Sequence, residues 1–128
     1  MGELEQEITI ERDPDAVWKL VGDFGGVATW FPGLENVRVE GDTRHVNTTG
    51  LDIAETMRSR DDATRTLSYS ITEIPIPLES HLAEITVHAD GAGSRVTWKV
   101  TVVPDDLLPI FVDVYKGALS ALKEHCES

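Results

Sequence analysis

Residues 105–126 have the sequence DDLLPIFVDVYKGALSALKEHC and show the longest helical hydrophobic period in the chain. Their apolar residues recur every three or four positions, which places them on one stripe of an α-helix. This predicted stripe consists of Leu107, Ile110, Phe111, Val114, Ala118, Ala121 and Leu122. At about 1.5 Å per residue, such a helix spans roughly 30 Å, the width of a small domain. We therefore expect this helix to be the spine of the fold.

Most of the chain before this helix has the pattern of β-strands. Residues 4–10 alternate apolar and polar side chains with the period of a half-buried strand. From Asn36 to Val103, stretches of this kind are separated by turn residues, which predicts three hairpins. The expected strands are 37–40 and 44–49, 51–60 and 64–73, and 78–89 and 94–103.

Two short helices are predicted between the first and second strands. Asp13 is placed to cap a helix with Pro14 at its first position, and residues 27–31 form at most a second short helix, after a break at 23–26. The resulting order is strand, two short helices, six strands and a long helix. Only the concave face of a curved sheet lets the helix's apolar stripe meet the inward side chains of the strands. We therefore predict an α+β fold, with a curved seven-stranded antiparallel sheet around the C-terminal helix.

Composition limits the classes of function. A chain of 128 residues, 41% of them hydrophobic, predicts one domain, residues 1–128, with one core. The net charge of −12 opposes binding to nucleic-acid phosphates and is typical of a solvated surface, with an acidic docking face as the alternative. No apolar run predicts membrane insertion, and MGELEQEITI lacks the features of a signal peptide. With Cys126 as its one cysteine, the chain is expected in a reducing cytoplasm.

Three segments carry a resemblance to a known superfamily. They are PDAVWKLVGDFGGVATWFPGLENVRVEG at 14–41, LDIAETMRSRDDATRTLSYSITEIPIPLESH at 51–81 and SRVTWKV at 94–100. Together with the terminal helix they resemble the START-like, Bet v 1-like (SRPBCC) superfamily, specifically its bacterial polyketide cyclase/dehydrase and lipid-transport group. The resemblance covers essentially the whole chain and implies a helix-grip fold with a hydrophobic cavity. Because that superfamily includes aromatase/cyclases, hormone receptors, lipid carriers and chaperone activators, the resemblance is more specific for fold than for function.

Glu55 is the most informative polar residue. It shares the odd-numbered face of its strand with three apolar residues, Leu51, Ile53 and Met57. A carboxylate is therefore expected among inward side chains, where burial costs several kcal/mol unless it is paired. In plant hormone-receptor relatives a glutamate in a similar context lines the ligand pocket, so the resemblance implies a ligand contact. The alternative is a glutamate near the sheet mouth that an Arg or Tyr satisfies.

Other candidates follow from the same alternation. His81 begins the smaller-apolar face of its strand and could act as acid, base or hydrogen-bond donor, or be satisfied locally. Tyr69 is an inward residue for which ligand contact and core packing are both open. The small residues Gly117 and Ala118 indicate room above the sheet. The remaining candidate cavity residues are Phe31, Ile53, Met57, Ile71, Trp98, Ile110, Val114 and Ala118.

Charged and metal-binding alternatives are weaker. Arg44 and Arg58 could anchor an acidic ligand, but we interpret them as solvated strand residues. The four histidines are scattered and no metal-binding spacing occurs, so no metal or cofactor is predicted.

Three hypotheses follow from the sequence. The favoured one is a binding module that holds a small, largely hydrophobic molecule, lipid or polyketide-like, between sheet and helix. The second is a polyketide cyclase or dehydratase in which Glu55 and His81 act as catalytic acid and base. The third is an interaction module whose acidic surface binds a protein partner.

Overall fold

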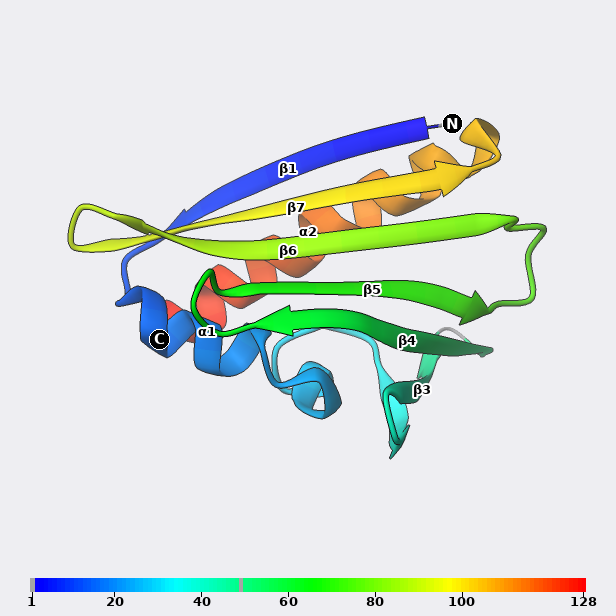
Figure 1. Cartoon of the computed structure of the whole chain (residues 1–128), viewed down its shortest axis with the longest axis horizontal. Helices are drawn as coiled ribbons and strands as arrows, with labels where there is room; N and C mark the ends of the chain where they lie inside the picture. The colour runs from blue at the N-terminus through cyan, green and yellow to red at the C-terminus, as the bar shows by residue number, and fades with distance from the viewer. Residues whose placement is uncertain (1, 49) are drawn as a thin grey trace.

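The computed structural model describes residues 2–48 and 50–128 (Figure 1). In chain order the elements are β1 (Gly2–Ile10), α1 (Pro14–Val21), the 3₁₀ helix η1 (Phe24–Thr29), β2 (Glu35–Glu40), β3 (Thr43–Thr48), β4 (Leu51–Asp61), β5 (Thr66–Glu73), β6 (Ser80–Asp90), β7 (Gly93–Val103), the 3₁₀ turn η2 (Asp105–Leu107) and α2 (Leu108–Glu127). Thr49, the expected last residue of a strand, lies outside the described residues.

The strands form one antiparallel sheet in the order β1-β7-β6-β5-β4-β3-β2. The strands from β2 to β7 therefore pair with their neighbours in sequence, and β1 pairs with β7 at the other edge of the sheet. Helix α2 packs against β1 and β7, and Figure 1 shows it crossing one face of the sheet. The predicted seven-stranded antiparallel sheet around a long C-terminal helix is confirmed.

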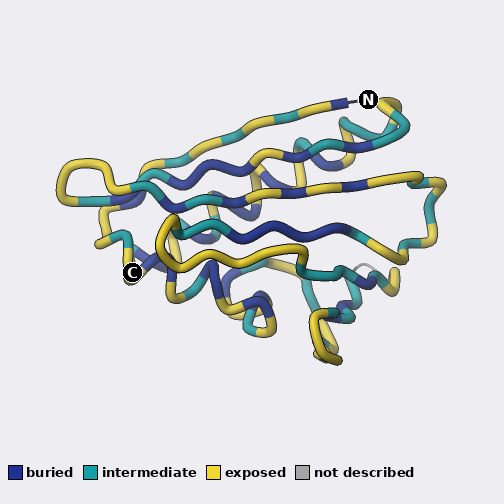
Figure 2. The backbone as a smooth tube through the Cα atoms, viewed as in Figure 1, coloured by how far each residue is buried: buried dark blue, intermediate teal, exposed yellow. Residues whose placement is uncertain are grey.

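Alternating burial along the strands locates the core on the face toward α2. In β6 the side chains of His81, Ala83, Ile85 and Val87 are buried, and the residues between them are exposed or half-buried. Figure 2 shows this alternation along β6 and more continuous burial along β5. The hairpin turns at Gly41 and Gly91 have positive φ, which glycine adopts without a steric penalty.

The second short helix begins earlier than the sequence predicts. Residues 23–26, expected to be a break, contain the start of η1, because the Asp23 carboxylate accepts a hydrogen bond from the Gly26 N–H and caps it. Just after η1, Trp30 packs on Trp98 of β7, with ring centroids 6.0 Å apart. The two short helices therefore close one end of the core.

The buried stripe of α2 is rotated relative to the predicted one. Its buried residues are Phe111, Tyr115, Ala118, Leu119, Leu122 and Cys126. Ile110 and Val114, which were expected to face the sheet, are 51% and 45% exposed. The reason is Tyr115, whose ring lies 4.4 Å from that of Trp98 and takes the central place against the sheet. Ile110 and Val114 consequently lie along the edge of the helix.

Gly117 lies on the solvent side of α2, where an added Cβ would meet no atom within 4 Å. We expect Gly117→Ala to raise the free energy of unfolding by about 0.5–1 kcal/mol, because alanine has the higher helix propensity. Urea denaturation measures the change.

Gly93→Ala is the control for this substitution. A Cβ at Gly93 would lie 2.7 Å from the Ile10 carbonyl oxygen, so this change should destabilise the protein. A loss of stability in Gly117→Ala would contradict the placement of residue 117 on the solvent side.

Candidate functional site

A cavity of about 360 Å³ lies between the sheet and the N-terminal half of α2. Its wall comes from η1 and the segment after it, from β3, β4 and β5, from the loop after β5, and from α2. The polar residues among those that line it are Arg44, Thr48, Glu55 and Tyr115, and the rest are Val, Leu, Ile or Phe. The chain therefore builds a largely apolar site with a small number of polar groups.

Six of the predicted site residues line this cavity: Phe31, Ile53, Glu55, Ile71, Ile110 and Val114. Five do not belong to its wall: Met57, Tyr69, His81, Trp98 and Ala118. Tyr69, Trp98 and Ala118 are at most 2% exposed because they pack in the core. The space therefore does not arise above Gly117 and Ala118, as the small residues suggested. It lies nearer the start of α2, beside the helix edge that Ile110 and Val114 form.

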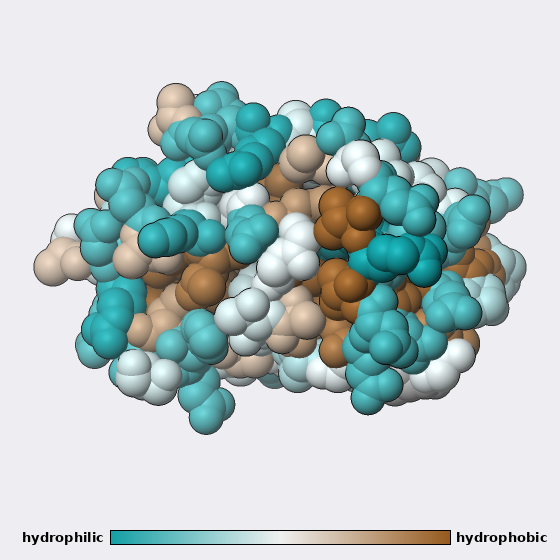
Figure 3. Space-filling model, turned by 90° about the horizontal axis from the view of Figure 1, so that it is seen from below, coloured by the Kyte–Doolittle hydropathy of each residue, from teal (hydrophilic) through white to brown (hydrophobic). Residues whose placement is uncertain are grey.

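Apolar side chains reach the surface where the cavity opens. Ile110, Val114 and Leu51 all line the cavity and are at least one-third exposed. Viewed from the side of the short helices, the molecule shows hydrophobic atoms at its surface between polar groups (Figure 3). A contiguous exposed apolar patch rimmed by polar residues is a common mark of a binding site.

Arg44 and Glu55 form a buried ion pair in the cavity wall. They are directly opposite each other on β3 and β4, and Arg44 Nε donates to Glu55 Oε1 at 2.7 Å. Arg44 Nη1 also donates to the Phe24 carbonyl at 2.8 Å, and its guanidinium lies 3.9 Å from the centroid of the Phe24 ring. The two side chains are only 5% and 13% exposed. The wall thus carries two charges of opposite sign that compensate each other.

The interpretation of Arg44 as a solvated residue was wrong. Its side chain lies on the core side of β3, where the cross-strand register places it opposite Glu55. The opposite charge of Glu55 offsets part of the desolvation cost of burying both side chains. The strand alternation of 44–49 was visible in the sequence, but the register between β3 and β4 was not. Arg58, in contrast, is exposed and donates through Nε to Ser70 Oγ.

A second polar group forms where β5 and β6 separate. Their pairing ends at Tyr69 and Ala83, and the next inward side chain on β6, His81, accepts the Ile71 N–H through Nδ1 at 3.1 Å. The other ring nitrogen, Nε2, lies 2.9 Å from the Tyr115 hydroxyl. His81 thereby links β5, β6 and α2.

Protonation of this group follows from its burial. Burial lowers the pKa of His81 from 6.5 to about 4, so its imidazole is neutral at neutral pH. Burial, with the nearby Tyr69 and Glu55, raises the pKa of Tyr115 well above its ordinary value, so the phenol keeps its proton. The Tyr69 hydroxyl donates to the Tyr115 oxygen at 3.4 Å.

Sequence reasoning missed Tyr115. It lies four residues after Phe111 and three before Ala118, so the helical spacing already placed it on the buried side. The predicted stripe left it out, although a buried tyrosine needs only one hydrogen-bond partner for its hydroxyl. In the structure Tyr115 is both a core residue and part of the cavity wall.

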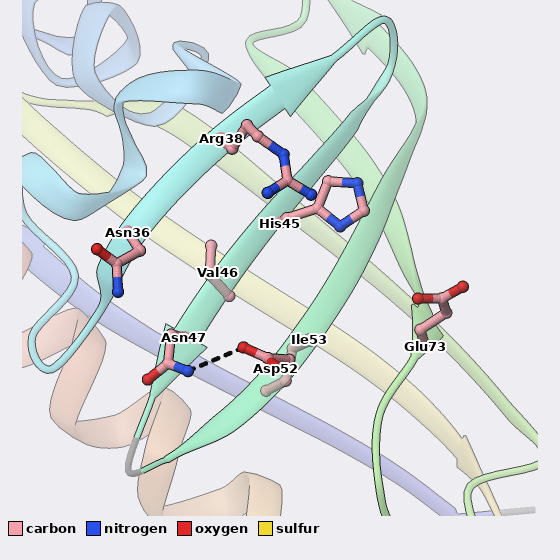
Figure 4. Close-up of a pocket in the computed structure, with 8 residues that line it drawn as sticks. All are labelled: Asn36, Arg38, His45, Val46, Asn47, Asp52, Ile53 and Glu73. Carbon is pink, nitrogen blue, oxygen red and sulfur yellow. Dashed lines mark hydrogen bonds between the residues drawn. The ribbon is translucent and has the colours of Figure 1, made fainter.

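A separate, more polar hollow of about 270 Å³ lies on the part of the sheet formed by β2, β3 and β4 (Figure 4). Its polar side chains mostly bind one another or their neighbours. Asn47 donates to Asp52 at 2.9 Å, and Arg38 pairs with Glu40 at 3.1 Å. The apolar cavity is therefore the better candidate for a ligand site.

Residues 2–48 and 50–128 contain no group of three or more His, Cys, Asp or Glu side chains placed to hold a metal ion. No helix in these ranges is both long enough and apolar enough to cross a membrane.

Comparison with solved structures defines the class of fold. The allergen Ara h 8.0201 matches with a TM-score of 0.79 at 19% identity, over 97% of this chain and 96% of that one. BexL, a di-domain ARO/CYC protein from the BE-7585A biosynthetic pathway, matches with a TM-score of 0.81 at 21% identity, over 98% of this chain and 46% of that one. At these identities the likeness concerns the fold alone. It is the helix-grip fold of Bet v 1-like proteins, as the sequence predicted.

The family follows from a closer comparison. A model of the family described as polyketide cyclase / dehydrase and lipid transport matches residues 1–127, and the chain belongs to this family. The protein XoxI from Bacillus cereus is 27% identical, with a TM-score of 0.91 over 98% of this chain and 96% of that one. A search of curated protein sequences found no match.

The Arg44–Glu55 pair generates a stability prediction. Glu55→Leu leaves the Arg44 charge buried without its partner and should lower the free energy of unfolding by about 3–5 kcal/mol. The double variant Arg44→Met/Glu55→Leu should recover most of this loss, because it removes both charges. Urea denaturation of both variants measures the difference.

Glu40→Leu is the matched control. Glu40 pairs with Arg38 on the surface, where both side chains are about two-thirds exposed, so the change should cost less than about 1 kcal/mol. Equal losses in the single and the double variant at Arg44 and Glu55 would contradict a compensated buried pair.

His81 generates a prediction about pH. The unfolded chain takes up a proton on this histidine below about pH 6.5, and the folded protein does so only near pH 4. The unfolded state therefore binds more protons in this window, and stability is lost as the pH falls through it. The full loss is about 3 kcal/mol, since one pKa unit corresponds to about 1.4 kcal/mol. Urea denaturation near neutral pH and near pH 4 measures it.

Two histidine variants isolate this contribution. His81→Gln should weaken the pH dependence, and His125→Gln, at an exposed position, should retain it. An unchanged pH dependence in His81→Gln would show that the folded protein does not hold His81 in its neutral form.

Proposed function

We propose that the protein binds a small, largely apolar molecule, lipid or polyketide-like, in the cavity between the sheet and α2. The observation that carries this proposal is a cavity of about 360 Å³ whose wall is apolar apart from four residues. Small-molecule sites typically have roughly 300–1,000 Å³ and this kind of lining, with a few polar groups that fix orientation. The family description, which names polyketide cyclases, dehydrases and lipid transport, supports the same chemistry.

The exposed edge of α2 supports an occupant of this kind. Ile110 and Val114 line the cavity, and about half of each side chain faces solvent. Burial of apolar surface contributes about 25 cal/mol per Å², so a ligand that covers these side chains gains affinity from them. A polar ligand would gain nothing from this part of the wall.

Binding is better supported than proton transfer by Glu55 and His81. Glu55 lines the cavity, but one of its oxygens accepts from Arg44. His81 does not belong to the wall, and both of its ring nitrogens already have hydrogen-bond partners. An acid and a base that act on one substrate must both reach it, and these two residues do not face the cavity together.

The test is binding of N-phenyl-1-naphthylamine, an uncharged fluorescent probe whose emission rises in apolar sites. We expect saturable binding to the unmodified protein. Val114→Trp should weaken it about tenfold, because filling the cavity costs the complex on the order of 1–3 kcal/mol. Fluorescence titration, checked by native mass spectrometry, measures the dissociation constants.

Val39→Trp is the matched control, since Val39 is 48% exposed and does not line the cavity. This variant should bind the probe as the unmodified protein does. Equal affinity in Val114→Trp and Val39→Trp would place the probe elsewhere and refute the proposal, as would the absence of saturable binding.

A further inference from the structure

The hydrogen bonds around Tyr115 decide which chemical group the cavity can receive. His81 Nδ1 accepts the Ile71 N–H at 3.1 Å, so this nitrogen carries no proton. A neutral imidazole has one N–H, which must then be on Nε2. The contact of 2.9 Å between Nε2 and the Tyr115 oxygen is therefore a bond that His81 donates. Tyr115 is the acceptor.

The same oxygen accepts a second hydrogen bond from Tyr69. The geometry of that contact, 3.4 Å between the two oxygens, has the Tyr69 hydroxyl as donor. A phenolic oxygen has one hydrogen to donate and a limited capacity to accept. With both contacts accepted, the hydrogen of Tyr115 is directed to neither residue, and no described residue accepts it. Tyr115 lines the cavity and keeps its proton, so its hydrogen is left for a group that enters the cavity beside it.

Charge limits the group that this donor can meet. The nearest cation in the wall is Arg44, whose charge is compensated by Glu55 at 2.7 Å. A ligand carboxylate would lose its hydration, and its attraction to Arg44 would be opposed by repulsion from the Glu55 carboxylate. Its negative charge would therefore add little to the binding affinity. An uncharged oxygen acceptor has a smaller desolvation cost than a carboxylate, and it can accept a hydrogen bond from the Tyr115 hydroxyl.

We propose that the ligand of this cavity carries an uncharged oxygen acceptor, such as a ketone or ester carbonyl, and that Tyr115 donates a hydrogen bond to it. This inference rests on the proposed binding function and specifies the ligand class. The apolar part of the ligand lies along Ile110 and Val114, and the acceptor lies at the Tyr115 end. His81 is a positioning residue, because its Nε2–H is donated to the Tyr115 oxygen and leaves the Tyr115 hydrogen to the ligand.

The experiment compares three naphthalenes of similar shape as competitors of N-phenyl-1-naphthylamine. They are 2-acetonaphthone, which has a ketone, 2-isopropenylnaphthalene, its hydrocarbon analogue, and 2-naphthoate, its carboxylate analogue. In Tyr115→Phe, the dissociation constant of the ketone should rise about three- to tenfold, the range expected for one hydrogen bond. That of the hydrocarbon should change less than about twofold, since it makes no such bond. The unmodified protein should bind the carboxylate more weakly than the ketone.

Tyr69→Phe is the matched control. It removes a hydroxyl that donates to Tyr115 but leaves the Tyr115 hydrogen in place, and Tyr69 does not line the cavity. The affinities for the ketone and the hydrocarbon should both stay near those of the unmodified protein. Circular dichroism checks that each variant is folded.

Infrared spectroscopy of the bound ketone tests the bond without a substitution. Its carbonyl stretch in the unmodified protein should lie below the value in hexane, because a hydrogen bond weakens the C=O bond. A stretch at the hexane value would overturn the proposal even if Tyr115→Phe failed to fold.

The outcomes separate the two proposals. If the probe binds and both neutral naphthalenes displace it with affinities that Tyr115→Phe leaves unchanged or weakens equally, the acceptor proposal falls and the binding function stands. Tighter binding of the carboxylate than of the ketone also overturns the uncharged class. If the probe does not bind the unmodified protein at all, both proposals fall.

Discussion

The packing of Tyr115 against the sheet is the contact on which the rest of the structure depends. Its ring lies on Trp98 of β7, and its hydroxyl is bound to His81 of β6. Aromatic rings at this distance combine a large buried area with a preferred geometry. The hydrogen bond offsets the desolvation cost of burying the hydroxyl. The contact determines the rotation of α2 about its own axis. Because Tyr115 faces the sheet, Ile110 and Val114 must lie at the helix edge, and the space beside them is the cavity.

Polar groups in the cavity wall and directly behind it are held in place by hydrogen bonds and ring contacts. Arg44 is fixed by Glu55, by the Phe24 carbonyl and by the Phe24 ring. His81 is fixed by the Ile71 N–H at the point where β5 and β6 separate. Groups held in this way present a defined pattern of charge and donors before any ligand arrives, which reduces the ordering cost of binding. The fold by itself does not specify a function, so these residues carry the argument for one.

The sequence allowed part of the site to be predicted, and the failures have physical causes. Alternation on β4 correctly placed Ile53 and Glu55 on one face, and both line the cavity. Trp98 and Ala118 lie on the predicted inward faces, but they pack in the core and do not line the cavity. Periodicity predicts which side of an element a residue is on, but not whether other side chains fill the volume there. Arg44 was misinterpreted because a charged residue is normally exposed unless a partner is known, and the partner lies on another strand.

Local rules of the chain determined the order and type of the elements. The strands show a hydrophobic period of two, the last helix shows a period of 3.6, and turn residues separate the hairpins. These patterns depend only on residues close in sequence, and they were sufficient to predict the architecture. The tertiary structure alone decided the rotation of α2, the register that joins Arg44 to Glu55, and the tautomer that frees the Tyr115 hydrogen. Each depends on atoms that meet from separate elements, such as Ile71 and His81 or Trp98 and Tyr115. No pattern within one element contains that information.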